Sequence, residues 1–351
     1  MIRKIINCIS IHQGGGIIYL TMMHSDLDKK DNLILLDNRA KGNLKTFKYA
    51  KLKYYKRGLF RNLFICLERI KTTIIFRRYL NRTKKKEYLN EYYLNGIPPL
   101  FRFPLRSNRV FIFCQNKNIY KFINYFDKKL FFKIKFYIYN VLHIFLINNF
   151  LRDSDTLIVQ TSSMKKCITN LKPKNKILIK DHYWKNLSID FFNFNLNERN
   201  NNFKDNEIIE LERIAKSNKL FFYPASFDPH KNHKILFNVF NNLSKNSFNN
   251  IKLIVTLNSN HIPKKYKSNN QIIFIGKQNH SNINKIYKIA DFLIFPSLNE
   301  SLGLPLIEAK LNNLPIISSD LDYVYDVCIP IFTFNPYSEE DIYSKIVKSL
   351  V

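Results

Sequence analysis

Short runs of apolar residues recur along the chain and are separated by amphipathic stretches. The runs are Ile5–Ile9, Leu33–Asp37, Val110–Phe113, Thr156–Gln160, Ile177–Lys180, Leu220–Tyr223, Ile251–Thr256, Gln271–Ile275, Phe292–Phe295 and Pro315–Ser318. Most of them are continuously apolar and do not alternate with polar residues, which is typical of strands buried on both faces of a parallel sheet. Because helical segments lie between them, the order predicts an α/β fold with doubly wound parallel sheets.

The polar stretch Asn193–Asn206 has too little apolar content for a strand or a core helix. A chain of 351 residues predicts two domains, since domains span roughly 100–200 residues. We therefore expect a first domain at 1–192, a linker at 193–206 and a second domain at 207–351.

Two segments stand apart from this pattern. Lys45–Arg106 mixes basic and aromatic residues without a clear period and yields no assignment. Phe136–Leu151 is the longest uncharged apolar stretch, but it is shorter than the ~20 residues that a membrane-spanning helix needs, so it predicts a buried helix. The amino terminus has too short an apolar run for a signal peptide, and we expect a cytoplasmic protein.

The chain is strongly basic, with 56 Lys and Arg against 27 Asp and Glu and a formal net charge of +29. Such a charge favours anionic partners. Lys, Asn, Ile, Phe and Tyr are all abundant, however, which indicates that codon bias contributes to the charge. Five cysteines lie far apart without the spacing of a zinc site or a disulfide framework.

Glycine is scarce, with only 8 residues, so each glycine is expected where a side chain does not fit. Gly15 and Gly16 end a glycine triplet that follows the first predicted strand. A glycine-rich turn at this place either lets a phosphate or sugar approach the backbone or is a plain flexible turn. Both readings stay open on this evidence.

The segment from Phe295 to Ala309 passes from a predicted buried strand through a loop into a helix. Pro305 suits the first turn of that helix. The amides of Leu302, Gly303 and Leu304 are then expected at the helix N-terminus, where an anion binds favourably. Two carboxylates, Glu300 and Glu308, flank this anion site.

A second polar cluster, Phe222–Lys234, follows the first strand of the second half. Asp228-Pro229 predicts a turn, and Asn232 is a candidate cap for a helix that begins near His233. Lys231 is then expected at the mouth of an interdomain cleft, where its ammonium can neutralise a phosphate. The alternative for Lys231 alone is a solvated lysine in a basic protein.

Two segments together resemble a known family. Tyr223–His233, YPASFDPHKNH, and Ile289–Glu308, IADFLIFPSLNESLGLPLIE, are similar to the donor-binding half of family 4 (group 1) retaining glycosyltransferases of the GT-B fold. The Glu300-x7-Glu308 spacing matches the paired-glutamate motif of that family. The resemblance is specific over about Leu220–Val327 and is weaker in the first half.

The resemblance implies the GT-B architecture, in which two Rossmann-like domains with doubly wound parallel sheets face a central cleft. It further implies that Lys231 binds the donor diphosphate, Glu300 the transferred hexose and Glu308 the nucleotide ribose. The amides of residues 302–304 are expected to hold the β-phosphate. The remaining donor-side residues that it implies are Gly15, Gly16, Ser226, Gly276, Lys277 and Gln278.

The chain departs from the family pattern at several positions. Ser226 stands where many members carry an arginine, so one of two usual diphosphate cations is missing. Gln115 and Asn116 are the polar candidates on the acceptor side, where many members place a histidine. The chain ends at Val351, so we expect the family's C-terminal crossing helix to be largely absent.

The predicted function is that of a retaining hexosyltransferase which uses a nucleotide-sugar donor and needs no metal or other cofactor. Its expected acceptor is a saccharide or lipid-linked glycan, as in lipopolysaccharide or capsule biosynthesis. The basic-aromatic tracts Lys45–Arg57 and Arg77–Lys86 suit an anionic membrane surface or single-stranded nucleic acid, or are solvated faces. Because acceptors of the family that the chain resembles are often lipid-linked or envelope glycans, we rank the membrane surface above nucleic acid as a further partner. We therefore expect a cytoplasmic, peripheral membrane enzyme. The alternative is a non-catalytic GT-B-like protein that binds nucleic acid or another polyanion.

Three pairs of aspartates mimic a DxD metal motif: Asp26 with Asp28, Asp153 with Asp155, and Asp320 with Asp322. Short matches of this kind arise by chance, and we expect none of them to hold a required metal. Asp320 is instead expected to cap a helix. His230 and His233 lack a third ligand, so they are expected to be structural or to lie near phosphate.

Overall fold

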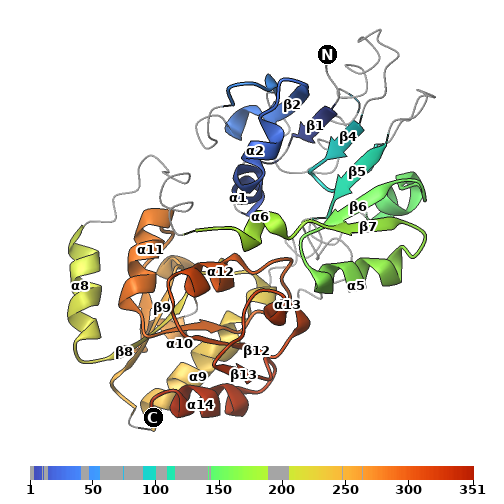
Figure 1. Cartoon of the computed structure of the whole chain (residues 1–351). Helices are drawn as coiled ribbons and strands as arrows, with labels where there is room; N and C mark the ends of the chain where they lie inside the picture. The colour runs from blue at the N-terminus through green and yellow to red at the C-terminus, as the bar shows by residue number, and fades with distance from the viewer. Residues whose placement is uncertain are drawn as a thin grey trace. The chain divides into compact units, whose positions relative to one another are not determined.

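The computed structural model describes residues 4–9, 11, 15–40, 47–55, 74, 90–99, 109–114, 141, 144–188, 205–246, 248–262 and 264–351. The chain divides into two compact units, Met1–Leu187 and Ser188–Val351 (Figure 1). Most of the polar stretch predicted as a linker lies outside the described residues, and a helix begins at Asp205.

The first unit contains a parallel sheet of seven strands in the order β3-β2-β1-β4-β5-β6-β7. Its strands are β1 Lys4–Cys8, β2 Asn32–Asp37, β3 Lys51–Tyr55, β4 Asn90–Tyr93, β5 Val110–Phe113, β6 Thr156–Val159 and β7 Lys176–Ile179. Its helices include α1 Gly15–Met22, α2 His24–Leu27, α5 Ser162–Leu171 and α6 His182–Lys185, with a 3-10 turn η1 at Asn38–Ala40. The order of the strands reverses between β1 and β4, as in a doubly wound sheet.

The second unit contains a parallel sheet of six strands in the order β10-β9-β8-β11-β12-β13. Its strands are β8 Lys219–Tyr223, β9 Ile251–Val255, β10 Ile272–Phe274, β11 Phe292–Phe295, β12 Ile316–Ser319 and β13 Phe332–Phe334. Its helices are α8 Asp205–Ala215, α9 His233–Lys245, α10 Lys264–Lys267, α11 His280–Ile289, α12 Leu304–Leu311, α13 Asp322–Tyr325 and α14 Glu339–Lys348, with 3-10 turns η3 Pro229–Lys231 and η4 Ser259–His261.

Each predicted strand is present, with its ends within a residue of the predicted ones. β8 illustrates why continuous apolar runs predict these strands. Its first residue is exposed and the other four are buried, as expected for a central strand covered on both faces. In the second unit α8, α11 and α12 lie on one side of the sheet, and α9 and α14 lie on the other (Figure 1). The predicted fold class is confirmed.

The helices that cover this sheet follow simple amphipathic rules. α9 buries residues spaced three and four apart, among them Leu236, Phe237, Phe240 and Leu243. α14 begins with Ser338 as N-cap and has acidic residues in its first turn and basic ones in its last, which suits the helix dipole. α14 packs against α9 within the second unit (Figure 1).

The part of Phe136–Leu151 that the structure describes agrees with the predicted helix. Residues 144–150 are helical, and Leu146 and Ile147 are buried among them, whereas Phe145 is 54% exposed. Among the described residues, no helix is both long and apolar enough to cross a membrane.

Candidate functional site

The carboxyl ends of β8 and β11 lie side by side where the strand order of the second sheet reverses. Phe221 and Phe222 of β8 pair with Phe292 and Leu293 of β11. From β8 the chain continues to β9 on one side, and from β11 it continues to β12 on the other. Ligands of doubly wound sheets bind at such a switch point. The two loops that follow these strands carry Lys231 and Glu300.

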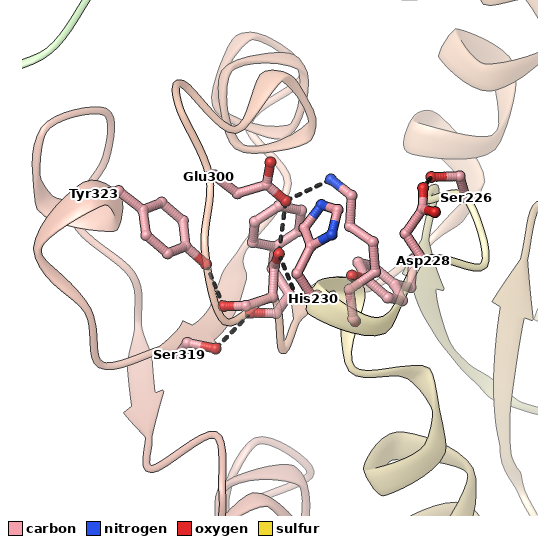
Figure 2. Close-up of polar contacts among 10 residues, drawn as sticks. Ser226, Asp228, His230, Glu300, Ser319 and Tyr323 are labelled. Carbon is pink, nitrogen blue, oxygen red and sulfur yellow. Dashed lines mark hydrogen bonds and ion pairs between the residues drawn. The ribbon is translucent and has the colours of Figure 1, made fainter. Parts of the chain in front are cut away.

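Lys231 and Glu300 form an ion pair across these two loops. Lys231 Nζ lies 2.5 Å from Glu300 Oε1, and the side chains are 16% and 12% exposed. Ser297 Oγ lies 2.6 Å from the same carboxylate oxygen and 3.1 Å from the carbonyl oxygen of His230. Leu298 N also donates to that carbonyl at 2.7 Å. Glu300 therefore sits at the centre of a polar network that joins the loops (Figure 2).

Two buried tyrosines hold the backbone of this network. The hydroxyl of Tyr323 donates to the carbonyl oxygen of Ser297 at 2.6 Å, and that of Tyr223 donates to the carbonyl oxygen of Lys231 at 2.7 Å. Burial raises the pKa of both hydroxyls well above the usual range. Both hydroxyls therefore keep their protons and remain donors. Their bonds hold the backbone of the two loops in place, and with it the positions from which the side chains of Lys231 and Glu300 extend.

Ser226 lies at the edge of the same cluster. Its hydroxyl donates to Asp228 Oδ2 at 2.7 Å in an exposed position (Figure 2). The predicted turn at Asp228-Pro229 is present: Lys231 N donates to the carbonyl oxygen of Asp228, and residues 229–231 form η3.

The predicted side-chain cap at Asn232 is wrong. Asn232 occupies the N-cap position of α9, but its backbone is left-handed, with φ 57°, and its side chain makes no capping bond. Nδ2 instead donates to the carbonyl oxygen of Pro336 at 2.7 Å. Asn232 therefore ties the loop before α9 to the segment before α14, and its left-handed backbone differs from the extended conformation that a capping residue adopts.

His233 begins α9 and is 2% exposed. Its ring contacts those of Tyr223, Phe227 and Phe237. Burial lowers the pKa of His233 to about 3, with a smaller contribution from the charge of Lys231. The imidazole is therefore neutral at physiological pH and acts as a packing group under the Lys231 loop.

The N-terminus of α12 lies three residues beyond Glu300. Gly303 is its N-cap with φ 73°, a left-handed conformation that suits glycine, and Pro305 stands in the first turn as predicted. Within the described parts of the chain, no hydrogen bond uses the amides of Leu302, Gly303 or Leu304. These amides and the helix dipole favour an anion beside Glu300.

Glu308, one turn further along α12, pairs with a different helix. Its Oε2 accepts a hydrogen bond from Tyr287 of α11 at 2.9 Å, and its Oε1 lies 3.8 Å from His280 Nδ1. Glu308 is 8% exposed. Burial raises the pKa of this carboxyl, whereas His280 and the bond from Tyr287 act in the opposite direction. The structure thus brings Lys231 to Glu300 and places Glu308 in a separate cluster on the same helix-loop segment.

The segment Gly276–Gln278 follows β10 at the carboxyl edge of the same sheet. Gly276 has φ 69° and Lys277 is exposed. Gln278 is tied locally, because its Nε2 donates to the carbonyl oxygen of Ile275 at 2.5 Å and its Oε1 accepts from Asn282 at 3.2 Å. Gly276 is therefore the member of this trio whose backbone requires glycine.

In the first unit, Gly15 and Gly16 form the first residues of α1. The positive-φ glycines that the structure describes are Gly96, Gly276 and Gly303. Gly15 and Gly16 are helical and are not among them, so a positive φ is not what places glycine at these two positions. Gln115 and Asn116 lie outside the described residues.

Tyr287 and His280 of the Glu308 cluster were not among the predicted site residues. Tyr287 shares the apolar face of α11 with Ile283 and Ile286 and has the spacing of a core residue. The hydroxyl of Tyr287 could have identified it in the sequence, since a buried tyrosine hydroxyl needs a hydrogen-bond partner.

The described carboxylates of the DxD look-alikes are engaged by protein donors. Tyr183 OH donates to Asp26 Oδ2 at 2.6 Å, and Arg152 N donates to Asp155 Oδ2 at 2.9 Å. Asp320 does not cap a helix as predicted: its Oδ1 accepts a bond from Tyr325 OH at 2.5 Å. No group of three or more potential metal ligands occurs among the residues that the structure describes.

Residues 204–347 match the family model described as glycosyl transferases group 1. No curated protein matches the sequence of the chain.

Several solved structures share the fold over almost the whole chain. Sucrose-phosphate synthase from Thermosynechococcus elongatus is 13% identical, with a TM-score of 0.67, and covers 99% of this chain and 90% of its own. HepE from Anabaena, in complex with UDP and glucose, is 12% identical, with a TM-score of 0.64 and coverage of 100% and 90%. WaaG, a glycosyltransferase involved in lipopolysaccharide biosynthesis, is 12% identical, with a TM-score of 0.61 and coverage of 100% and 90%. The two parallel sheets are thus those of the GT-B fold.

Proposed function

We propose that this chain, whose residues 204–347 match the family model of group 1 glycosyl transferases, transfers a hexose from a nucleotide-sugar donor to a saccharide or lipid-linked glycan acceptor. The observation that carries the proposal is the Lys231–Glu300 pair, 2.5 Å apart, directly before the N-terminus of α12. A cation, a carboxylate and a helix terminus at one switch point suit a sugar diphosphate.

In this proposal each group has a defined task. As the glycosidic bond breaks, negative charge develops on the β-phosphate, and the amides of residues 302–304 together with Lys231 stabilise it. Glu300 accepts hydrogen bonds from hydroxyls of the hexose, and Glu308 accepts them from the ribose. An ammonium has three N–H donors, so Lys231 can keep its bond to Glu300 and still reach a phosphate oxygen.

We further propose that transfer retains the configuration at the anomeric carbon and needs no metal. The fixed amides and Lys231 supply the charge stabilisation that a divalent cation supplies in other transferases. The anomeric configuration of the product is measured by NMR. Transfer is expected to proceed unchanged in the presence of EDTA.

The acceptor side of the proposal places the enzyme at an anionic membrane surface. On β3, at the edge of the first sheet, Lys51 and Lys53 are exposed, and Tyr49 and Tyr54 beside them are 57% and 38% exposed. Basic and aromatic side chains together suit a lipid headgroup region. WaaG, one of the similar structures, is described as acting in lipopolysaccharide biosynthesis.

The test of the proposed function is donor binding followed by transfer. UDP-glucose, GDP-glucose and ADP-glucose are screened by thermal shift, with UDP-glucose first because HepE was solved with UDP and glucose. Lys231→Ala and Glu300→Ala are expected to abolish transfer. The matched control is Lys219→Ala, which removes a lysine that pairs with Asp291 at 2.8 Å in the same unit. It is expected to leave transfer unchanged.

Two outcomes contradict the proposal. Full transfer by Lys231→Ala or Glu300→Ala rules out the assigned roles. Tight, salt-sensitive oligonucleotide binding without any nucleotide-sugar binding identifies a polyanion-binding protein instead, which the net charge of +29 makes the competing function.

A further inference from the structure

Glu308 has a buried hydrogen-bonding neighbour in Tyr287 of α11. Its Oε2 accepts a hydrogen bond of 2.9 Å from the hydroxyl of Tyr287. That hydroxyl also lies 3.3 Å from the carbonyl oxygen of Pro305. A hydroxyl has one proton, and the bond to the charged carboxylate is both the shorter and the stronger type. The Tyr287 proton is therefore directed at Glu308.

Tyr287 is a rigid donor. It is 2% exposed, and its ring packs edge-on against that of Phe222 in β8, with the centroids 5.1 Å apart. Burial raises the pKa of Tyr287 well above the usual range, and the nearby Glu308 charge raises it further. The hydroxyl consequently stays protonated, and the core of the sheet holds it in place.

The bond leaves the two carboxylate oxygens of Glu308 in different states. Oε2 is held by Tyr287, while Oε1 points toward His280, whose Nδ1 is 3.8 Å away, beyond hydrogen-bond distance. Glu308 and His280 line a small pocket between α11 and α12 together with Asn284 and Asn312. Oε1 is thus the oxygen of Glu308 that the Tyr287 bond does not occupy.

We infer that Tyr287 is a positioning residue for the donor: its hydroxyl holds Oε2 of Glu308 so that Oε1 accepts the ribose hydroxyls of the nucleotide. The inference rests on the proposed function, which assigns the ribose to Glu308. The expected occupant is the cis-diol of a ribonucleotide, because a carboxylate oxygen accepts from hydroxyl groups and a 2′-deoxyribose lacks one of them.

The experiment compares Tyr287→Phe with Tyr266→Phe. Tyr266 is the matched control, since it is also 2% exposed and its hydroxyl lies 3.0 Å from Asn238 Oδ1 in the same unit.

Calorimetry measures the affinity of the full chain for UDP and 2′-deoxy-UDP, or for the GDP or ADP pair if thermal shift shows that one of those diphosphates binds more tightly. Tyr287→Phe is expected to weaken ribonucleotide binding by roughly tenfold, the scale of one charge-assisted hydrogen bond. It should also remove most of the preference over the 2′-deoxy form, whereas Tyr266→Phe should keep both.

A second measurement separates positioning from packing. The hydrogen bond to the ionised form lowers the pKa of Glu308, so its removal raises that pKa. In Tyr287→Phe the loss of UDP affinity on acidification should therefore begin at a higher pH than in the wild type. Tyr287 and His280 are the titratable groups that face Glu308 from α11, and His280 is unchanged in both variants. In a Glu308→Gln background the Tyr287→Phe change should have no further effect on the 2′-deoxy preference.

The outcomes are distinct. If wild-type protein binds none of UDP, GDP and ADP, the proposed function fails, and the inference fails with it. If the wild type binds and Tyr287→Phe matches Tyr266→Phe in affinity, 2′-deoxy preference and pH profile, Tyr287 is only a core residue and the inference alone is overturned. Should Tyr287→Phe not fold, Glu308→Asp replaces it, because the shorter side chain keeps the charge and loses the bond; an unchanged 2′-deoxy preference then overturns the inference.

Discussion

Glu308 is a buried ionisable residue whose burial lowers the stability of the fold. A carboxylate that is 8% exposed loses most of its hydration, and one hydrogen bond from Tyr287 compensates only in part. Burial accordingly raises its pKa. Strained electrostatics of this kind are common at functional sites.

The pH dependence of stability follows from the direction of that shift. The unfolded chain ionises Glu308 at the ordinary pKa of glutamate, about 4.3, while the folded protein does so at a higher pH. The native state therefore binds more protons between these two pKa values, and stability falls as the pH rises through this window. Above the raised pKa the cost of the buried charge is fully present.

We expect Glu308→Gln to unfold at a higher denaturant concentration than the wild type at neutral pH. The gain should vanish well below the ordinary pKa of about 4.3, where the carboxyl is protonated in both states. Urea unfolding of both proteins across this range measures the difference. Glu212→Gln on the exposed face of α8 is the control and should unfold at the same denaturant concentration as the wild type. The same Glu308→Gln protein should bind UDP more weakly, and equal stability at all pH values would contradict the assigned burial cost.

At the scale of elements, the site is built from turns at the carboxyl ends of strands. Gly303 precedes α12 with φ 73°, and Gly276 follows β10 with φ 69°. Both turns require a left-handed residue, but their surroundings differ. A Cβ at Gly303 would lie 3.0 Å from Leu306 Cδ1, whereas one at Gly276 would meet nothing within 4 Å.

The difference in surroundings predicts which of the two glycine-to-alanine substitutions lowers the free energy of unfolding more. Gly276→Ala carries only the left-handed penalty, about 1–2 kcal/mol, and Gly303→Ala carries it together with a contact that displaces Leu306. We expect Gly303→Ala to be the more destabilising of the two by about 1 kcal/mol, the lower end of overpacking costs. Urea unfolding measures both. Gly303→Ala should also weaken UDP binding because it shifts the first amides of α12, and identical unfolding free energies would show that Leu306 moves without cost.

Three strands, β3, β4 and β13, were not predicted, and each lacks the apolar run that identified the others. β3 is an edge strand with exposed lysines, as edge strands often are. β13 has only three residues. β4 lies beside the central β1 and yet carries Glu91, which is 0% exposed and accepts a bond from Tyr93 OH at 2.9 Å. A buried carboxylate that bonds to a tyrosine two residues along the same strand breaks the apolar pattern of a central strand.

At the scale of the whole molecule, the net charge of +29 is the dominant property. Each basic residue close to an anionic bilayer contributes about 1 kcal/mol, and the attraction falls off within a Debye length. If the positive charge holds the protein at the proposed membrane surface, its binding to anionic lipid weakens as the salt concentration rises.

We expect the protein to co-sediment with phosphatidylcholine vesicles that contain phosphatidylglycerol and not with pure phosphatidylcholine, and to be released at high salt. Replacing Lys51 and Lys53 with glutamate should weaken this binding more than replacing Lys285 and Lys288, two exposed lysines of α11, with glutamate. The two double variants change the net charge by the same amount. An equal loss in both double variants would show that the total charge acts, without a preferred surface at β3.

The sequence by itself determined the two-sheet fold and the loops that carry the chemistry. Continuous apolar runs mark buried parallel strands, and glycine, proline and paired glutamates mark the turn into α12, because these are local signals. Only the tertiary structure decided which of these side chains contact one another. Lys231 meets Glu300 from 69 residues away, and Tyr287 meets Glu308 from 21 residues away. Such pairs depend on the order in which strands assemble in the sheet, and no local period along the chain encodes that order.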